Sequence, residues 1–434
     1  MVYFINKSRM KNIVIIVVGV ILISLYYFPV QFTFFPVTNS KNLMGGLGML
    51  IAALEFPRKR SSILNEDFFV IMICAALVSL MGFFSVCYNE TPDYAYASYI
   101  RSFLIWQFAA YTVITYFRNM KGFVNVEMIC NFLIVMCVLQ CVSVLLIDTY
   151  PAVKNWANAN IDGMSYVDAH ERMYGFGPAL DIAGGRFASV LIMIAFLANK
   201  KRQLQETKTM MCYFAAFVFI LIVGSMVART TGIGAIISLV YLMWVNRSNI
   251  FKKEERRLLL ILGAFVVIGF FISSYLYQTN PAFKENIRFA FEGFFNWWET
   301  GEWETTSTNR WQTMILWPDN MKTWMIGDGY FDGPSDTDPY YVGPANPGFY
   351  KWTDIGYLRF IYYFGLIGLV IFMLYFCKVA LVCASRFSRY RTLFLFLLLF
   401  NFILWFKVST DIFLVFALFL CISKEENDKC EKVS

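Results

Sequence analysis

Four arginines could hold a phosphate or pyrophosphate, and three of them lie near glycine at the border of an apolar stretch. Arg172 and Arg186 belong to RMYGFGPALDIAGGRF, Arg229 to SMVARTTGIGA, and Arg310 to TSTNRWQTMILW. Arginine presents five donors in a planar fork that suits phosphate, and glycine lets a backbone approach a ligand closely. For Arg172 and Arg186 the alternative is snorkelling to lipid headgroups. For Arg229 the alternative is a role as an interfacial anchor, and for Arg310 it is an ordinary exposed arginine.

One carboxylate is well placed for acid–base chemistry. Asp354 stands immediately before the apolar run that begins at Ile355, where it could accept the proton of an attacking hydroxyl. The alternative is a helix cap, with Thr353 or Asp354 accepting from the first amides of the helix. Three residues of the polar segment 148–181 are further candidates for this acid–base role: His170, Glu171 and Asp181.

Metal and cofactor chemistry find little support. His170 is the only histidine, so a multi-histidine metal site is excluded, and the ten cysteines show no metal-binding spacing. No phosphate-binding loop of the GxxxxGK[ST] type is present. We therefore expect no metal and no cofactor. The net charge of +7 comes from short clusters of Lys and Arg between apolar runs, which indicates membrane topology and not a nucleic-acid partner.

The polar segment Thr279–Asp354 is rich in aromatic residues and holds seven of the eleven tryptophans: Trp297, Trp298, Trp303, Trp311, Trp317, Trp324 and Trp352. Their faces could stack on sugars, although an interfacial aromatic belt explains the first two equally well. We expect Trp311 and Tyr357 to contact the substrate. The pattern after Thr308 predicts a short amphipathic helix with Arg310 in its first turn.

The rest of the chain must position these groups, and it is almost entirely apolar. Hydrophobic residues make up 58% of the 434 and charged residues 15%, against about a quarter charged in soluble domains. A spanning helix needs about 20 apolar residues. We expect an all-α polytopic membrane protein with about twelve spans, at residues 13–30, 42–56, 68–87, 99–117, 127–147, 182–198, 209–227, 231–246, 258–278, 355–377, 392–407 and 410–423.

Seven basic clusters fall on one side of this twelve-span arrangement, which the positive-inside rule makes cytoplasmic. Both termini are then cytoplasmic, and the run at 13–30 is an uncleaved first helix because no small-residue cleavage site follows it. The outer loops are 148–181 and 279–354. The expected organisation is nine spans in 1–278, the large outer loop 279–354, and three spans with a short tail in 355–434.

This arrangement resembles the O-antigen polymerase and ligase-like superfamily of bacterial membrane glycosyltransferases. The resemblance rests on RMYGFGPALDIAGG, SMVARTTGIGA, TNRWQTMILWPDNMKTWMIGDGY and DIGYLRFIYYFGLIGL, and it covers most of the chain. The family has an arginine followed by a glycine in each of two outer loops. Here eleven residues separate Arg172 from Gly184 and sixteen separate Arg310 from Gly327, each one more than in the family.

The resemblance implies a GT-C-like fold in the bacterial inner membrane and a polymerase of O-antigen, capsule or exopolysaccharide. The enzyme would transfer a growing glycan from undecaprenyl pyrophosphate to the next lipid-linked repeat unit. Arg172 and Arg310, with Arg186 and Arg229, would hold the pyrophosphate, and Asp354 would orient or deprotonate the acceptor hydroxyl. The implied partners are the undecaprenyl-pyrophosphate-linked oligosaccharide, membrane lipid and a chain-length regulator protein.

Two other functions compete with this interpretation. An O-antigen ligase would share the fold, but the ligase branch typically has His-Asn where this chain has Asp354-Ile355. A polysaccharide flippase or other transporter would also have about twelve spans. Transporters usually show internal repeats and polar sites at the membrane midplane, whereas this chain concentrates its polar residues in one outer loop.

Overall fold

The computed structural model describes residues 2–58, 63–169, 172–204, 206–246, 271, 273–334 and 348–427. Over these residues the chain forms helices and only two isolated β-bridges, so the all-α fold class is confirmed. The helices divide between two compact units, each made of two stretches of sequence. Unit 1 comprises residues 1–39 and 127–305, and unit 2 comprises 40–126 and 306–434.

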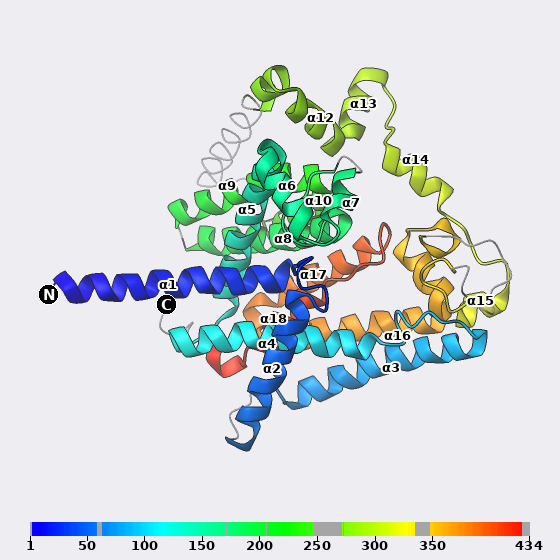
Figure 1. Cartoon of the computed structure of the whole chain (residues 1–434), viewed down its shortest axis with the longest axis horizontal. Helices are drawn as coiled ribbons and strands as arrows, with labels where there is room; N and C mark the ends of the chain where they lie inside the picture. Colours follow the sequence, from blue (N-terminus) through cyan, green and yellow to red (C-terminus); the bar gives the residue numbers. More distant parts are fainter. Residues whose placement is uncertain are drawn as a thin grey trace. The chain divides into compact units, whose positions relative to one another are not determined.

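Unit 1 contains nine labelled helices in the described residues (Figure 1). They are α1 (Val2–Tyr27), α5 (Val126–Thr149), α6 (Pro151–Asn160), α7 (Met164–Ala169), α8 (Leu180–Gln203), α9 (Thr207–Val227), α10 (Thr230–Asn246), α12 (Pro281–Ala290) and α13 (Glu292–Thr300). Helix α8 packs against α9 and α10, and α12 packs against α9. The segment after α5 folds as a small apolar cluster in which Ile147, Ala157 and Tyr174 are buried.

Unit 2 contains eight α-helices in the described residues: α2 (Ser40–Glu55), α3 (Glu66–Asn89), α4 (Tyr99–Lys121), α14 (Thr306–Thr313), α15 (Met321–Ile326), α16 (Gly356–Arg386), α17 (Arg391–Leu404) and α18 (Phe413–Leu420). Short 3-10 turns add η1 (Phe56–Arg58), η2 (Tyr350–Trp352) and η3 (Ser388–Tyr390). Helices α3, α4 and α16 lie side by side and form the core of the unit (Figure 1).

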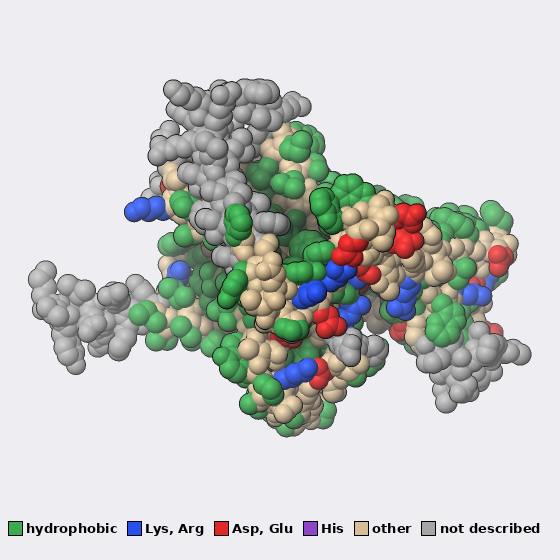
Figure 2. Space-filling model, turned by 90° about the horizontal axis from the view of Figure 1, so that it is seen from above, with side chains coloured by type: hydrophobic (Ala, Val, Ile, Leu, Met, Phe, Trp, Pro, Cys, Tyr) green, Lys and Arg blue, Asp and Glu red, His purple; other side chains and the backbone are tan. Residues whose placement is uncertain are grey.

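Five of the described helices are long and apolar enough to cross a membrane: α3, α5, α8, α9 and α16. Large apolar side chains remain exposed along α3, among them Ile73, Leu80 and Phe83, and Figure 2 shows apolar side chains exposed on the face that it presents. Such surfaces suit contact with lipid rather than water. The protein is therefore a helical membrane protein.

The predicted apolar segments coincide with helices wherever the structure describes them. Segment 258–278 lies mostly outside the described residues. The helices α2, α10, α17 and α18 have 16, 17, 14 and 8 residues, fewer than the roughly 20 that a straight span needs. The number of twelve spans stays a prediction.

Helix α16 is broken in its N-terminal third. Phe364 and Gly365 leave helical geometry, and Gly365 has φ +69°. A Cβ on Gly365 would lie 2.2 Å from the carbonyl oxygen of Met325 in α15, so only glycine lets these two backbones meet. The break also frees the carbonyls of Tyr362 and Tyr363, which accept the amides of Asp328 and Gly329. The turn after α15 is thereby docked into the broken helix.

The segment 279–354, expected as one large outer loop, is helical over much of its length and divides between the units. Helices α12 and α13 belong to unit 1, and α14 and α15 to unit 2, with the boundary after Thr305. Residues 335–347 of this segment lie outside the described part.

Candidate functional site

In unit 1, two of the predicted phosphate-binding arginines meet on one aromatic ring. The guanidinium carbon of Arg172 lies 4.0 Å from the ring centre of Phe289 in α12, and that of Arg229 lies 4.3 Å from it. The two arginines are 57 residues apart in the sequence, one before α8 and the other between α9 and α10. The ring of Phe289 therefore makes a cation–π contact with each of the two guanidiniums.

Acidic groups complete this arginine cluster. Arg229 donates from Nε to the Phe289 carbonyl (3.0 Å) and forms an ion pair with Glu292 (2.6 Å). The carboxylate of Asp181 accepts the hydroxyl of Thr230 and attracts Arg229 electrostatically. Burial lowers the pKa of Arg229, although arginine stays protonated at neutral pH. Glu292 and the Phe289 carbonyl therefore hold the guanidinium of Arg229 in place.

The glycine associated with Arg172 has a packing role. A Cβ on Gly184 would lie 2.7 Å from Cβ of Ala228 and 3.0 Å from Cβ of Thr230. The start of α8 can therefore lie directly against the α9–α10 connection, which brings Asp181 to Thr230. The sequence analysis linked such glycines to ligand approach, whereas the structure shows that Gly184 permits contact between helices.

Arg186 joins a different cluster within unit 1. It is 6% exposed and donates to the carbonyl oxygen of Tyr27, while the Tyr27 hydroxyl donates to the Arg186 carbonyl (3.1 Å). Its guanidinium lies 5.6 Å from the ring centre of Phe28. Arg186 thus ties α8 to the end of α1, inside the protein rather than at lipid headgroups. His170 and Glu171 lie outside the described residues.

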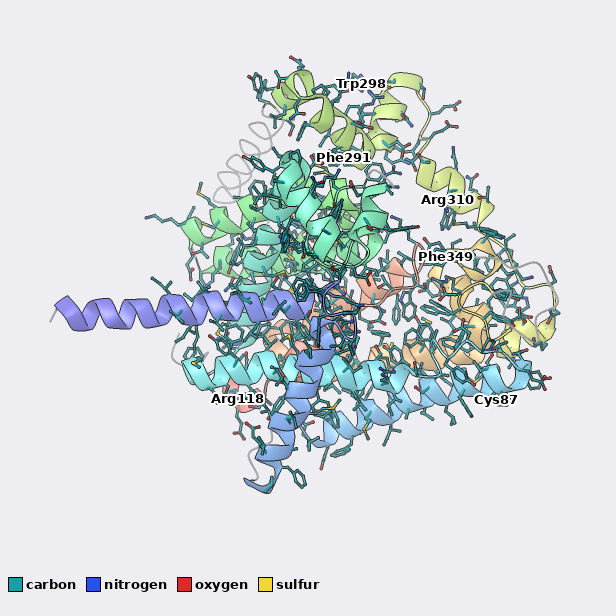
Figure 3. The ribbon with its side chains drawn as sticks, in the orientation of Figure 1. Cys87, Arg118, Phe291, Trp298, Arg310 and Phe349 are labelled. Atoms are coloured by element: carbon teal, nitrogen blue, oxygen red, sulfur yellow. The ribbon has the colours of Figure 1, made fainter. Side chains whose placement is uncertain are left out.

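In unit 2, Arg310 is exposed on α14 (Figure 3). The predicted position was wrong in one respect: the helix runs from Thr306 to Thr313, so Arg310 stands in its last turn and not its first. Met314 and Ile315, expected to continue the helix, instead pack against a buried cluster that includes Tyr330, Tyr350 and Leu358. Burial of these two side chains outweighs one further helical turn.

Trp311 and Tyr357 both contact the connection that follows α17. The indole Nε1 of Trp311 donates to the carbonyl of Phe406 (2.9 Å). The ring of Tyr357 lies 4.9 Å from that of Phe406, and its hydroxyl donates to the carbonyl of Phe402 (3.0 Å). The structure therefore brings these two predicted substrate contacts to one aromatic surface.

Asp354 is half-buried directly before α16. The N-cap residue is Ile355, whose side chain makes no capping hydrogen bond, so neither Thr353 nor Asp354 occupies the N-cap position. Thr353 makes only a long contact, its hydroxyl accepting the Ile355 amide at 3.4 Å. Arg359, one turn into α16, attracts Asp354 electrostatically.

A polar cluster that the sequence pattern did not predict surrounds Arg359. This side chain is 5% exposed, donates to Ser409 Oγ (2.7 Å) and to the Phe331 carbonyl (2.9 Å), and pairs with Asp332 (2.8 Å). The signal was available, because an arginine inside the apolar run IGYLRFIYYFGLIGL is costly and usually functional. The same reasoning had been applied to Arg186.

Position 327, where the glycine associated with Arg310 stands, also requires glycine for steric reasons. Its φ is +85°, and a Cβ would lie 2.5 Å from the carbonyl oxygen of Tyr363 at the break in α16.

In the same unit the rings of Trp317 and Trp324 are stacked at 5.9 Å, and Trp317 is 60% exposed. A stacked pair with an open face suits the apolar side of a sugar ring.

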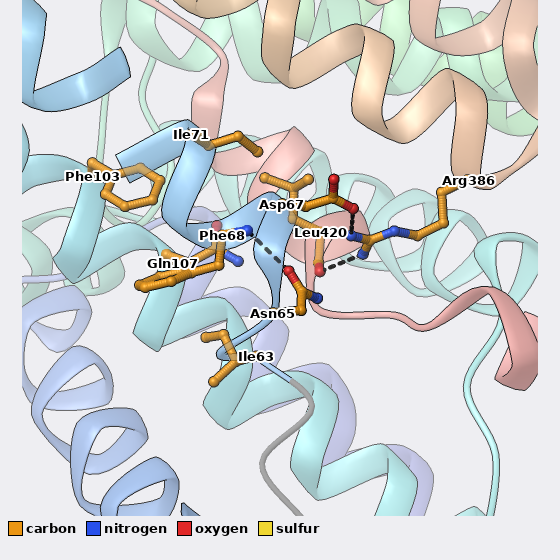
Figure 4. Close-up of a pocket in the computed structure, with 9 residues that line it drawn as sticks. All are labelled: Ile63, Asn65, Asp67, Phe68, Ile71, Phe103, Gln107, Arg386 and Leu420. Carbon is orange, nitrogen blue, oxygen red and sulfur yellow. Dashed lines mark hydrogen bonds and ion pairs between the residues drawn. The ribbon is translucent and has the colours of Figure 1, made fainter. Parts of the chain in front are cut away.

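Two further observations limit the chemistry. In the part of the chain that the structure describes, no three His, Cys, Asp or Glu side chains gather as metal ligands. A small cavity in unit 2 is lined by Asp67, Gln107 and Arg386, among others (Figure 4). Arg386 and Asp67 already pair across it (2.6 Å).

Comparison with known proteins identifies no relative: no family model matches the chain, and no curated protein matches it.

Proposed function

We propose that this protein is a membrane polysaccharide polymerase of the bacterial inner membrane, with a GT-C-like arrangement of twelve spans and both termini in the cytoplasm. The acceptor hydroxyl attacks the anomeric carbon of the donor glycan, and the bond from that carbon to the pyrophosphate oxygen breaks. Undecaprenyl pyrophosphate leaves, and the hydroxyl proton passes to Asp354. The product is a glycan longer by one repeat unit on the acceptor lipid.

The observation that carries this proposal is the meeting of Arg172 and Arg229 on Phe289. Two guanidiniums a few ångströms from one ring can each contact one phosphate of a diphosphate. Glu292 pairs with Arg229, and Asp181 attracts it electrostatically. Fixed donors of this kind stabilise the negative charge that develops on a leaving pyrophosphate.

Unit 2 carries the second set of proposed groups. Arg310 is an exposed arginine for an anionic group, and Asp354 is the proposed base. The stacked pair Trp317 and Trp324 and the surface around Trp311 offer aromatic faces for glycan.

The test is polymerisation of a defined undecaprenyl-pyrophosphate-linked repeat unit by purified protein. Arg172→Ala and Arg310→Ala should each lower the rate by about 10- to 100-fold, since a charge-assisted hydrogen bond contributes about 1.5–3 kcal/mol. Arg288→Ala is the matched control, because Arg288 is a partly exposed arginine already paired with Glu299 (2.7 Å). The proposal fails if both variants keep the rate of the control.

A deletion strain separates the competing functions. Loss of a polymerase leaves single repeat units on the final acceptor, whereas loss of a ligase leaves polymer on the carrier lipid. Repeat units held on the cytoplasmic side would indicate a flippase.

A further inference from the structure

The connection between α3 and α4 holds the segment Gly327–Asp332 along its whole length. Asn89 Nδ2 donates to the carbonyl of Gly327 (3.2 Å), and Thr91 Oγ1 donates to that of Gly329 (2.8 Å). Asp93 Oδ2 accepts the amides of Phe331 (2.7 Å) and Asp332 (3.0 Å). Alternate residues of NETPD thus meet alternate residues of GDGYFD in one register.

Arg359 holds the same segment from the other side. Its guanidinium lies 3.5 Å from the ring centre of Phe331 and 4.1 Å from that of Phe349. It bonds to the Phe331 carbonyl and to the Asp332 carboxylate, which is 69% exposed. Arg359 is therefore anchored by the segment that Asp93 fixes, and the carboxylate that pairs with it, Asp332, is exposed.

One donor of Arg359 is unmet. Its Nε–H is buried and has no hydrogen-bond partner among the described residues. An unmet buried donor destabilises the fold. Asp354, the proposed base, lies five residues earlier and is the other nearby carboxylate that Arg359 attracts.

We propose that Asp93 and Arg359 are positioning residues for the transfer reaction: Asp93 fixes the Gly327–Asp332 backbone, which holds Arg359, and Arg359 orients Asp354. This inference rests on the proposed function. It makes the α3–α4 connection, which no sequence pattern had singled out, a component of the site in unit 2.

The experiment compares Asp93→Ala, Asp93→Asn and Glu90→Gln in the full-length protein. Asparagine keeps an acceptor oxygen for the two amides, whereas alanine removes it. Glu90 is an exposed acid of the same connection and serves as the control. The readouts are hydrogen exchange of the peptide that contains Phe331 and Asp332, and kcat and KM of polymerisation.

Asp93→Ala should speed exchange at these amides at least tenfold and lower kcat at least tenfold with KM changed less than threefold. Asp93→Asn should restore both to within about threefold of the control. If Asp93→Asn loses as much kcat as Asp93→Ala while exchange stays slow, Asp93 acts through its charge and the positioning role is overturned. Unchanged exchange in Asp93→Ala overturns the geometry itself.

Arg359→Gln gives a second arm. It should lower kcat without changing the donor KM, at protein levels and thermal stability comparable with Asp93→Ala. Wild-type kcat in both Arg359→Gln and Asp93→Ala, with Arg172→Ala inactive, would refute this inference and leave the proposed function standing. Accelerated exchange in Asp93→Ala together with full activity of Arg172→Ala and Arg310→Ala would refute the proposed function instead.

Discussion

Replacing Gly327 by alanine should undo the docking of the turn after α15 into the broken helix α16. Gly327 has φ +85° and ψ −176°, a region that is almost restricted to glycine, so alanine adds about 1–3 kcal/mol of backbone strain. The added Cβ would also lie 2.5 Å from the Tyr363 carbonyl oxygen and 2.7 Å from the Phe364 nitrogen. Both are backbone atoms, and overpacking of this kind costs about another 1–3 kcal/mol. The free energy of unfolding should fall by about 2–6 kcal/mol.

Gly122→Ala is the matched control for this change. Gly122 ends α4 in the same unit with φ +79° and ψ −9°, and nothing lies within 4 Å of its added Cβ. It isolates the cost of a left-handed alanine, about 1–2 kcal/mol. The difference between the two variants measures the steric contact with α16 and the extra strain at Gly327.

The assay is thermal unfolding of purified protein in detergent, followed by tryptophan fluorescence. Gly327→Ala should lower the Tm several degrees further than Gly122→Ala. Hydrogen exchange should also rise at the amides of Asp328 and Gly329, which bond to the α16 carbonyls. Equal Tm values and unchanged exchange would show that the turn does not enter the break, and would refute the reasoning.

Three further outcomes are expected. Arg186→Met should lower the Tm without changing KM for the lipid-linked donor, because Arg186 joins α8 to α1; a raised KM with an unchanged Tm would contradict this. Trp317→Ala should raise the KM for the proposed glycan substrate about 3- to 10-fold, since an aromatic stack contributes about 0.5–1.5 kcal/mol. Trp298→Ala, which removes an 84% exposed ring, should leave that KM unchanged. Equal effects of the two changes would favour an interfacial aromatic belt. The hydrogen bond from Arg288 lowers the pKa of Glu299. The stabilisation by this pair is therefore present above the unfolded pKa of about 4.3 and is lost as the pH falls below it. Tryptophan fluorescence of α13 should change between about pH 5 and pH 3, and Glu299→Gln should abolish that change.

The local sequence predicted the helices well because each depends on a continuous apolar run. The runs at 68–87 and 355–377, for example, fall within α3 (Glu66–Asn89) and α16 (Gly356–Arg386). A run of about 20 apolar residues must satisfy its own backbone groups in a membrane, and a helix does this without help from the rest of the chain.

The residue types of the site could also be found in the sequence, but their grouping could not. Arg172 and Arg229 were both expected to bind phosphate, yet nothing in the sequence places them on the ring of Phe289. The pairing depends on how α8, the α9–α10 connection and α12 pack. Gly184 sets part of that packing through its contact with Ala228.

Tertiary structure alone decided the rest of unit 2. The end of α14 at Thr313 follows from burial of Met314, and the break in α16 follows from the close approach of Met325 to Gly365. The hydrogen bond from the Phe331 amide to Asp93 joins residues that are 238 apart in the sequence. An apolar run determines its own helix because its hydrogen bonds are local, whereas a break, a docked turn and a shared aromatic ring exist only where two distant backbones meet.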